Sequence, residues 1–358
     1  MSRGKSTRAG ICLLAMTVAT AACGSGDTDS GEETAAAEEV QIRVADQYST
    51  EHPIAVASIL PFMEEVERQS DGRITFEYFG SNELVEATDI PSAIQDGIAD
   101  MGNLLYIGSV NPLMYVVQLP GLYADPETGA ASEALLDFVT ENENVAGTLD
   151  ETGIHPLICL TTTNYQILTS GPVNSPQDLQ GRQLRASGNV LPLSIDALGA
   201  VPVNLSINET YEAINRGVVD GVSISVPSVR EYAFTEVAPN VVVNVNLGGF
   251  PVCYGISEGI WDELSPEDQE LMTSVGREIS RSAGEELAAT VEEQIAEWES
   301  SGVTVVTFDE AERSAAADAL SSVEERWIED LEESGIADAG DAVEQWKTTL
   351  EEALEGER

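Results

Sequence analysis

An eight-residue pattern, A-I-x-x-G-x-x-D, occurs twice in the chain, at residues 93–100 and 213–220. In each copy we expect a short helix to end at the glycine, which adopts the left-handed conformation of a helix C-terminus without steric strain. An apolar run follows each copy and predicts a strand. Two such units predict two similar lobes, with residues 101–107 and 221–226 opening onto one cleft. A chance match of a common helix-glycine-strand pattern is the alternative.

The length of the chain also favours two lobes, because about 320 folded residues exceed what a single hydrophobic core usually holds. Apolar periodicity predicts strands at residues 40–45, 74–79, 157–160, 250–256 and 303–308. It predicts helices at residues 53–69, 133–140 and 266–300, and scattered Pro and Gly predict a loop over 110–123. The strands at 157–160 and 250–256 would connect the two lobes.

The first 22 residues predict a signal peptide. Three basic residues precede an apolar run over residues 9–22, which is too short to span a bilayer because a spanning helix needs about 20 residues. Small residues directly before Cys23 resemble a bacterial lipobox, so we expect cleavage before Cys23 and lipidation of its thiol. The mature protein would be extracytoplasmic, held by the lipid to the periplasmic or cell-surface side of the membrane. A secreted protein with an incidental cysteine is the alternative.

Residues 24–39 contain several acidic side chains and no large apolar side chain. Such a segment cannot bury enough surface to fold, so we expect residues 23–39 to form a lipidated, flexible tether. Its root-mean-square reach would be about 20 to 25 Å.

The composition is strongly acidic, with 63 Asp and Glu against 16 Lys and Arg and a formal net charge of −47. A field of this sign disfavours nucleic acid and anionic lipid as partners. It also provides no long-range attraction for an anionic solute. An anion must therefore be captured by local groups.

Motifs of catalysis and of metal binding are incomplete. Residues 255–259 fit the G-x-S-x-G pattern of a nucleophile elbow, but the histidine of such a triad follows the serine, whereas His52 and His155 both precede it. The few cysteines and histidines offer no metal cluster, and no glycine-rich phosphate loop is present. We therefore expect a binding protein with no metal and no cofactor, and not an enzyme.

Cys159 and Cys253 lie on the two strands that would connect the lobes. A disulfide between them could form in an oxidising exterior. Two buried free thiols are the favoured interpretation, because free cysteine is among the most buried residue types.

Arg185 is the main candidate for a ligand contact. The alternating run at residues 183–186 predicts a strand, and S-G-N at 187–189 predicts its end. In an open α/β sheet, ligands bind beyond the carboxyl ends of the strands. A guanidinium fork matches a carboxylate better than any other side chain does. An ordinary surface arginine is the alternative.

The motifs around Arg185 extend in both directions along the chain. They comprise N-S-P-Q-D-L-Q-G at residues 174–181, L-G-A at 198–200, G-V-V-D-G at 217–221 and W-D-E-L-S-P-E-D-Q at 261–269. In this order and spacing they resemble the extracytoplasmic solute-binding proteins of TRAP-type transporters, the group that includes the C4-dicarboxylate binders. The similarity covers about residues 40–330.

This resemblance implies an α/β, two-lobed periplasmic-binding-protein-like fold, with a ligand cleft between the lobes and long C-terminal helices. The first lobe would comprise residues 40–156 and the second 157–252, and residues 253–358 would return to the first lobe. The implied function is to bind a small organic carboxylate and deliver it to the membrane subunits of a TRAP-type permease. A ligand-sensing lipoprotein that acts with a membrane signalling receptor is the alternative.

The resemblance also implies which residues contact the ligand: Arg185, Gln47, Tyr48, Tyr106, Tyr165, Ser223, Ser225 and Phe250. Two positions depart from the family's sugar-acid binders, because Tyr165 stands where some members have an arginine and Ile224 where they have an asparagine. With one firm cation and several aromatic faces, we expect a monocarboxylate with an apolar or aromatic body. Sialic acid, succinate and malate should bind less well.

Overall fold

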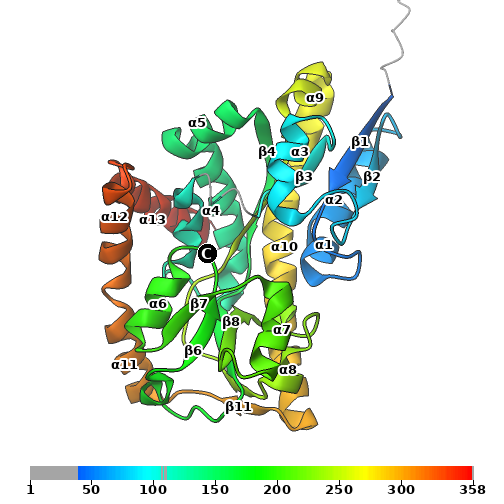
Figure 1. Ribbon diagram of the computed structural model, residues 1–358. Coiled ribbons are helices and arrows are strands. Elements are labelled where there is room, and N and C mark those ends of the chain that lie inside the picture. Colours follow the sequence, from blue (N-terminus) through cyan, green and yellow to red (C-terminus); the bar gives the residue numbers. More distant parts are fainter. Residues whose placement is uncertain (1–38, 106–107, 109–110, 357–358) are drawn as a thin grey trace, which may run out of the picture. The chain divides into compact units, whose positions relative to one another are not determined.

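The computed structural model describes residues 39–105, 108 and 111–356 (Figure 1). Cys23, the predicted signal peptide and nearly all of the predicted tether lie outside the described residues, as does Tyr106. No helix within the described ranges combines the length and the apolar character that a membrane span requires.

Two mixed sheets organise the fold, as the α/β prediction required. The five-stranded sheet has the order β2-β1-β3-β10-β4, with β1 (Val40–Ala45), β2 (Ile74–Phe79), β3 (Met101–Asn103), β4 (Ile154–Thr161) and β10 (Pro251–Ser257). The six-stranded sheet has the order β11-β9-β5-β8-β6-β7, with β5 (Tyr165–Thr169), β6 (Gln183–Ala186), β7 (Val201–Asn204), β8 (Gly221–Ser225), β9 (Asn240–Val242) and β11 (Thr304–Val306).

Helices cover these sheets and connect their strands. Before β10 they are α1 (Pro53–Ala57), α2 (Ile59–Gln69), α3 (Ile90–Gln95), α4 (Thr128–Glu141), α5 (Glu143–Thr152), α6 (Leu191–Ala197), α7 (Ile207–Asn215) and α8 (Phe234–Val237). The later ones are α9 (Glu258–Glu263), α10 (Pro266–Ser301), α11 (Glu310–Leu320), α12 (Val323–Glu333) and α13 (Ala339–Glu355). Short 3₁₀ turns include η3 (Pro112–Gln118), in a stretch that was expected to be a loop, and η6 (Val226–Ser228).

The two copies of A-I-x-x-G-x-x-D fold alike. The carbonyl of Ala93 accepts a hydrogen bond from the N–H of Ile98 at 2.8 Å, and the carbonyl of Ala213 accepts one from Val218 at 2.8 Å. The intervening glycine has φ of 70° in the first copy and 69° in the second. The repeat is therefore a repeated structure and not a chance match of letters.

The aspartate of each copy ties its strand to the neighbouring parallel strand. Asp100 Oδ2 accepts a hydrogen bond from the backbone N–H of Arg43 at the middle of β1 (2.9 Å), and Asp220 Oδ2 accepts one from Gln183 at the start of β6 (2.8 Å). Strand β3 then pairs parallel with β1, and β8 pairs parallel with β6. On its other edge each of these strands pairs with an antiparallel strand: β3 pairs with β10, and β8 pairs with β5.

The helix expected over residues 53–69 is divided into α1 and α2 at Ser58, so the prediction of one helix was wrong. Pro61 has no N–H to donate, and its ring crowds the carbonyl four residues earlier. Ser58 accordingly has φ −123° and ψ −84°, outside the helical region. Its hydroxyl donates to the Ile54 carbonyl at 2.6 Å.

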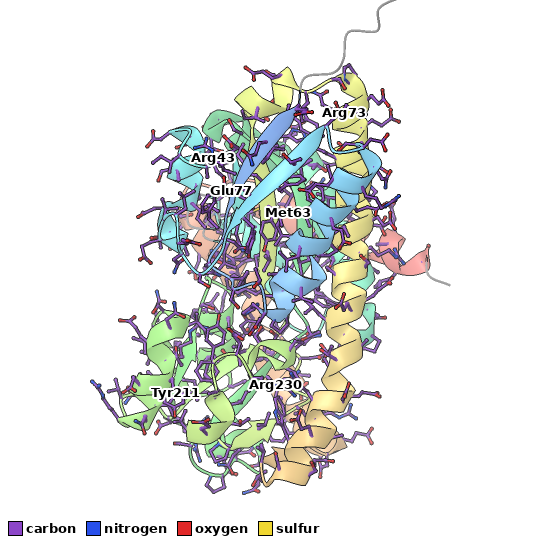
Figure 2. All side chains as sticks on the ribbon, turned by 90° about the vertical axis from the view of Figure 1, so that its right-hand side faces the viewer. Arg43, Met63, Arg73, Glu77, Tyr211 and Arg230 are labelled. Atoms are coloured by element: carbon purple, nitrogen blue, oxygen red, sulfur yellow. A yellow bond between two sulfur atoms is a disulfide. The ribbon has the colours of Figure 1, made fainter. Side chains whose placement is uncertain are left out.

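The long helix α10 begins and ends as the sequence predicts. Ser265 Oγ accepts a hydrogen bond from the N–H of Asp268 at 3.1 Å, and Gly302 closes the helix with φ of 93°. Over its 36 residues α10 contacts β4, α1, α2 and α4, and it also contacts η6 and β11. Figures 1 and 2 show this helix along the length of the fold. One helix therefore contacts elements attached to both sheets.

Sheet membership differs from the expected lobe boundaries. The boundary expected at residue 156 falls inside β4, which pairs with β10 along its whole length from Ile154 to Thr161. Strand β11 was expected to return to the first lobe, but it pairs parallel with β9 in the six-stranded sheet. An apolar run shows that a strand is present but does not show which sheet it joins.

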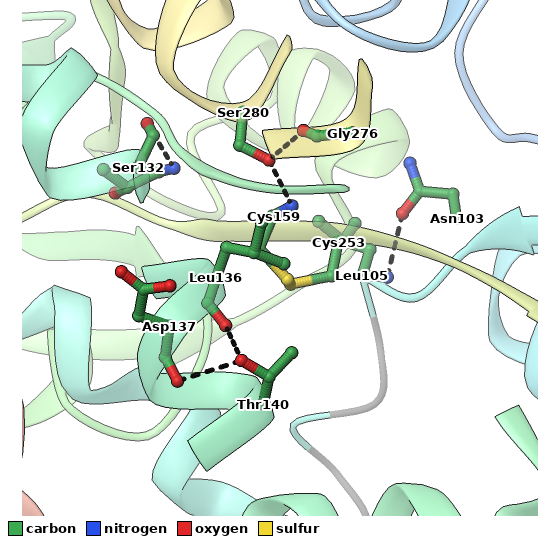
Figure 3. Close-up of a disulfide and its surroundings, with 11 residues drawn as sticks. Asn103, Leu105, Ser132, Leu136, Asp137, Thr140, Cys159, Cys253, Gly276 and Ser280 are labelled. Atoms are coloured by element: carbon green, nitrogen blue, oxygen red, sulfur yellow. Dashed lines mark hydrogen bonds between the residues drawn. A yellow bond between two sulfur atoms is a disulfide. The ribbon is translucent and has the colours of Figure 1, made fainter. Parts of the chain in front are cut away.

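Cys159 and Cys253 form a disulfide with an S–S distance of 2.06 Å, so the prediction of two free thiols was wrong (Figure 3). The two residues face each other in the antiparallel β4–β10 ladder. The Cys159 N–H donates to Ser280 Oγ (3.0 Å) and the Cys253 carbonyl accepts from Leu104 (2.7 Å). They thus form a non-hydrogen-bonded pair, the closer kind of cross-strand pair, and their Cα atoms are 4.1 Å apart.

Candidate functional site

A cavity of about 540 Å³ lies beyond the carboxyl ends of strands from both sheets. Gln47 and Tyr48, which follow β1, line it, as do Arg185 in β6 and residues 187–189 after β6. This is where open α/β sheets bind ligands, and the volume lies within the range of about 300 to 1,000 Å³ that is typical of small-molecule sites.

Five of the expected ligand-contact residues line this cavity: Gln47, Tyr48, Tyr165, Arg185 and Phe250. Tyr106 lies outside the described residues. Ser223 and Ser225 do not belong to the cavity wall.

The alternation of side chains along strand β8 explains why Ser223 and Ser225 are not on the cavity wall. Successive side chains of a strand point to opposite faces, and Ile224 is the residue of β8 that lines the cavity. Ser223 Oγ instead donates to the carbonyl of Arg185 at 3.0 Å, and Ser225 Oγ donates to Ser228 Oγ at 3.2 Å. Ser223 therefore braces the backbone that carries Arg185.

Arg185 is the one arginine or lysine among the described residues of the cavity wall. Its exposed fraction is only 7%. The Nε atom donates to the carbonyl of Leu205 at 3.1 Å, which orients the plane of the guanidinium. The strand beneath it is paired on both sides, with β7 and with β8. A carboxylate that reaches this group meets a largely desolvated cation, where charge-assisted hydrogen bonds are strongest.

The loop that follows Arg185 is held from two directions. Gln118 Nε2 donates to the carbonyl of Ser187 at 3.2 Å, and Trp327 Nε1 on α12 donates to Asn189 Oδ1 at 3.0 Å. Gly188 between them has φ of 79°, and a Cβ at this position would lie 2.3 Å from Gln118 Oε1. A glycine is needed here for its backbone conformation and for the close approach of Gln118.

Aromatic side chains form much of the remaining cavity wall. Tyr165 stacks on Phe250 with ring centroids 6.1 Å apart, and Tyr115 meets Phe250 edge-on at 5.6 Å. A second group places His52 between Tyr48 at 4.1 Å and Tyr232 at 6.0 Å. Both arrangements are favourable for aromatic pairs.

Sequence reasoning missed several polar and aromatic residues of the cavity wall: His52, Tyr115, Thr162, Asn204, Ser228 and Tyr232. Tyr115 lies in the segment that was interpreted as a loop, and Tyr232 lies in a turn between short elements. His52 carried a usable signal, because a histidine directly before a proline at the start of a helix is a candidate N-cap near the end of β1.

Asp46, the residue after β1, fixes the backbone directly before Gln47 and Tyr48, which line the cavity. Its two carboxylate oxygens accept hydrogen bonds from the Tyr48 N–H (3.1 Å), Asn103 Nδ2 (3.0 Å), Tyr78 Oη (3.0 Å) and Tyr254 Oη (2.8 Å). Only 1% of Asp46 is exposed. Burial raises its pKa to about 6, although the four donors act in the opposite direction. Asp46 thereby connects β1, β2, β3 and β10 beneath Gln47 and Tyr48.

Within the described ranges, no group of three or more His, Cys, Asp or Glu side chains is arranged to hold a metal ion. The described wall of the cavity offers one guanidinium, one imidazole, hydroxyl and amide groups, and aromatic faces.

Two mixed sheets with a cavity beyond their strand ends are typical of an α/β protein that binds a small molecule. The family model of bacterial extracellular solute-binding proteins, family 7, matches residues 44–330. The chain belongs to this family.

Individual relatives agree with this assignment. A solute-binding protein of Roseobacter denitrificans is 26% identical over 268 residues, which cover 72% of this chain and 78% of that protein. The ectoine-binding periplasmic protein TeaA of Halomonas elongata is 26% identical over 284 residues, which cover 76% and 81%. The structure of a TRAP solute-binding protein from Rhodoferax ferrireducens with benzoate has a TM-score of 0.80 at 17% identity, covering 89% of this chain and 100% of that chain.

The resemblance to TRAP-type extracytoplasmic solute-binding proteins is thus confirmed. The protein is an extracytoplasmic solute receptor, and its relatives are binding proteins. The comparisons support a role in transport and do not support the alternative of a sensing lipoprotein.

The raised pKa of Asp46 predicts how its contribution to stability depends on pH. Between its ordinary pKa of 3.8 and the folded value of about 6, the folded protein retains a proton that the unfolded chain has released. Stability from this group is therefore present below about pH 4 and is lost as the pH rises through 6. A pKa difference of about 2 corresponds to about 3 kcal/mol.

Asp46→Asn removes this titration and is the matched comparison. Urea unfolding of both proteins between pH 4 and pH 7 should show the free energy of unfolding of the wild type falling, relative to the variant, by about 2 to 3 kcal/mol. A difference that stays constant over this range would mean that the carboxyl group ionises alike in the folded and unfolded chains.

Proposed function

We propose that this receptor binds a small organic monocarboxylate with an apolar or aromatic body and delivers it to the membrane subunits of a TRAP-type permease, without chemical turnover. The observation that carries the proposal is a 7% exposed arginine, Arg185, in a cavity whose wall includes stacked Tyr165 and Phe250. The guanidinium would hold the carboxylate while the rings contact the body of the ligand.

The energetics favour such a body. Burial of apolar surface stabilises the complex by about 25 cal/mol per Å², and one charge-assisted contact orients the ligand. A second carboxylate would meet no second arginine or lysine, because Arg185 is the one such residue that the described residues place on the wall. A polyol would leave hydroxyl groups underpaired against Tyr165 and Ile224, at about 1 to 3 kcal/mol for each buried group.

Similar structures support an aromatic acid as ligand. Besides the benzoate complex from Rhodoferax ferrireducens, a marine metagenome protein holds 3-hydroxybenzoate (TM-score 0.78) and one from Bordetella bronchiseptica holds mandelate (TM-score 0.76). The same fold also holds D-glucuronate in a protein from Pseudomonas putida (TM-score 0.69). The fold therefore serves both ligand classes, and the wall of this cavity favours the first.

A lipid anchor at Cys23 would complete the receptor. The small residues before Cys23 and the acidic segment after it support an anchor followed by a tether. The tether would hold the receptor near its permease while it collects solute.

The ligand class can be tested by calorimetric titration with an aromatic acid, a branched 2-oxo acid, succinate, malate and sialic acid. We expect one of the first two to bind at least about tenfold more tightly than the others, which corresponds to about 1.4 kcal/mol. Tighter binding of a dicarboxylate or of the sugar acid would contradict the role given to Tyr165 and Ile224.

Arg185→Ala should weaken binding of the preferred acid by about two to three decades, because a carboxylate enclosed without its partner costs about 3 to 5 kcal/mol. Arg185→Lys should also lose much of the affinity, since the paired donors are gone. Arg216→Ala is the matched control: Arg216 pairs with Glu212 on the exposed surface of α7, away from the cavity. Equal affinities of Arg185→Ala and Arg216→Ala would show that the carboxylate binds elsewhere.

Cys23→Ser should release the protein from the membrane to the soluble fraction, because the thiol that would carry the lipid is removed. Fractionation of cells that express either form measures this, and titration of the released protein should give the affinity of the wild type. A Cys23→Ser protein that is still fully membrane-bound would rule out lipidation at this residue.

A further inference from the structure

His52 has a fixed position on the cavity wall. It precedes Pro53 at the N-terminus of α1, only 2% of it is exposed, and it lines the cavity. Its ring is stacked on Tyr48 with the centroids 4.1 Å apart, and Tyr232 contacts it edge-on at 6.0 Å. The imidazole is therefore held in one orientation by the rings on either side of it.

The hydrogen bonding of the ring determines which nitrogen carries the proton. Nδ1 accepts a hydrogen bond from the backbone N–H of Ile54 at 3.2 Å and so caps the first turn of α1. A nitrogen that accepts carries no proton, so the neutral ring has its N–H at Nε2. Burial lowers the pKa of His52 to about 4, which keeps the ring neutral at physiological pH.

The Nε2 atom is the remaining polar atom of this side chain. It is fully buried and has no hydrogen-bond partner among the residues that the structure describes. A buried donor without a partner is destabilising, and in native proteins such a group indicates a bound partner or a functional role. His52 is thus a residue of the cavity wall whose neutral ring has its N–H donor without a partner among the described residues.

We propose that His52 Nε2–H donates a hydrogen bond to an oxygen of the ligand that is not part of the carboxylate bound by Arg185. The proposal rests on the function proposed above. A guanidinium fork matches both oxygens of a carboxylate, so the imidazole donor is available for a further oxygen, such as an oxo or hydroxyl group. Since His52 follows β1 and Arg185 lies in β6, this ligand is bound from both sheets.

The inference narrows the ligand class to oxygen-substituted monocarboxylates. A neutral N–H donor discriminates by hydrogen bonding, because an acid without the second oxygen leaves the donor without a partner. The aromatic side chains can contact the ring of an acid with the second oxygen and the ring of the parent acid without it in the same way. Preference for the oxygenated acid should therefore depend on His52, whereas binding of the parent acid should depend on Arg185.

Two substitutions distinguish the capping role of His52 Nδ1 from the donor role of His52 Nε2. His52→Asn places an acceptor where Nδ1 lies and so retains the cap of α1, since asparagine is a favoured N-cap residue, but it has no donor at the position of Nε2. His52→Gln can place an amide N–H2 near the position of Nε2 and lacks the cap. The melting temperature without ligand should therefore be near that of the wild type for His52→Asn and lower for His52→Gln.

The probes are three acids: 3-phenylpropanoate, phenylpyruvate, which adds an oxo oxygen near the carboxylate, and 3-(4-hydroxyphenyl)propanoate, which adds a hydroxyl at the far end. With the wild type, titration should show at least one oxygenated acid binding about tenfold more tightly than 3-phenylpropanoate. This advantage should disappear in His52→Asn and be at least partly retained in His52→Gln.

Several outcomes would overturn the inference. An oxygen preference that is unchanged in His52→Asn would mean that another group recognises the oxygen, and equal weakening of all three acids would place His52 on the carboxylate itself. Loss of the preference in both variants, in proportion to their melting temperatures, would show that His52 acts only through the fold. Absence of binding of all three acids to the wild type would contradict the proposed function instead.

Discussion

The strand pairing that Asp100 and Asp220 support underlies the rest of this structure. Each carboxylate accepts the backbone N–H of a residue on the neighbouring parallel strand, Arg43 on β1 or Gln183 on β6. In each sheet the strand that donates this N–H, β1 or β6, has residues at or after its carboxyl end on the cavity wall. One strand end delivers Gln47, Tyr48 and His52, and the other delivers Arg185 with the loop held by Gln118 and Trp327. A pair of ordinary backbone contacts thus positions both groups of polar residues.

The features predicted correctly from the sequence are those with local causes. The helix-glycine-strand repeat, the bounds of α10 and the strand end at Arg185 are each encoded by a few adjacent residues. Features that depend on pairing between distant segments were not predictable in this way. Cys159 and Cys253 face each other because of the register of two strands that are distant in the sequence. Ile224 lines the cavity, and Ser223 and Ser225 do not, because of the face that β8 turns toward the cavity. The break at Ser58 was predictable, because Pro61 alone explains it.

Charge placement explains how so acidic a protein can bind an anion. Many of the few basic residues are engaged by nearby carboxylates: Arg43 with Asp100 (2.7 Å), Arg73 with Asp268 (2.8 Å) and Arg326 with Asp196 (2.9 Å), with Arg43 and Arg73 labelled in Figure 2. These pairs lie partly exposed, where the surrounding water weakens them. Arg185 is different because it is buried in the cavity wall. The acidic exterior repels an anion at long range, and the desolvated guanidinium attracts it at short range, where the interaction is strongest.

The disulfide between β4 and β10 joins residues 94 positions apart, one on the strand before the chain enters the six-stranded sheet and one on the strand by which it returns. Such a bond persists in an oxidising compartment and is disfavoured in a reducing cytosol. In a reducing cytosol, therefore, no covalent bond links these two strands. After export they are linked covalently, and the segment between them becomes a closed loop that contains Arg185. For the biogenesis of the receptor, the final covalent state of its binding site is reached only in the compartment where its solute is found.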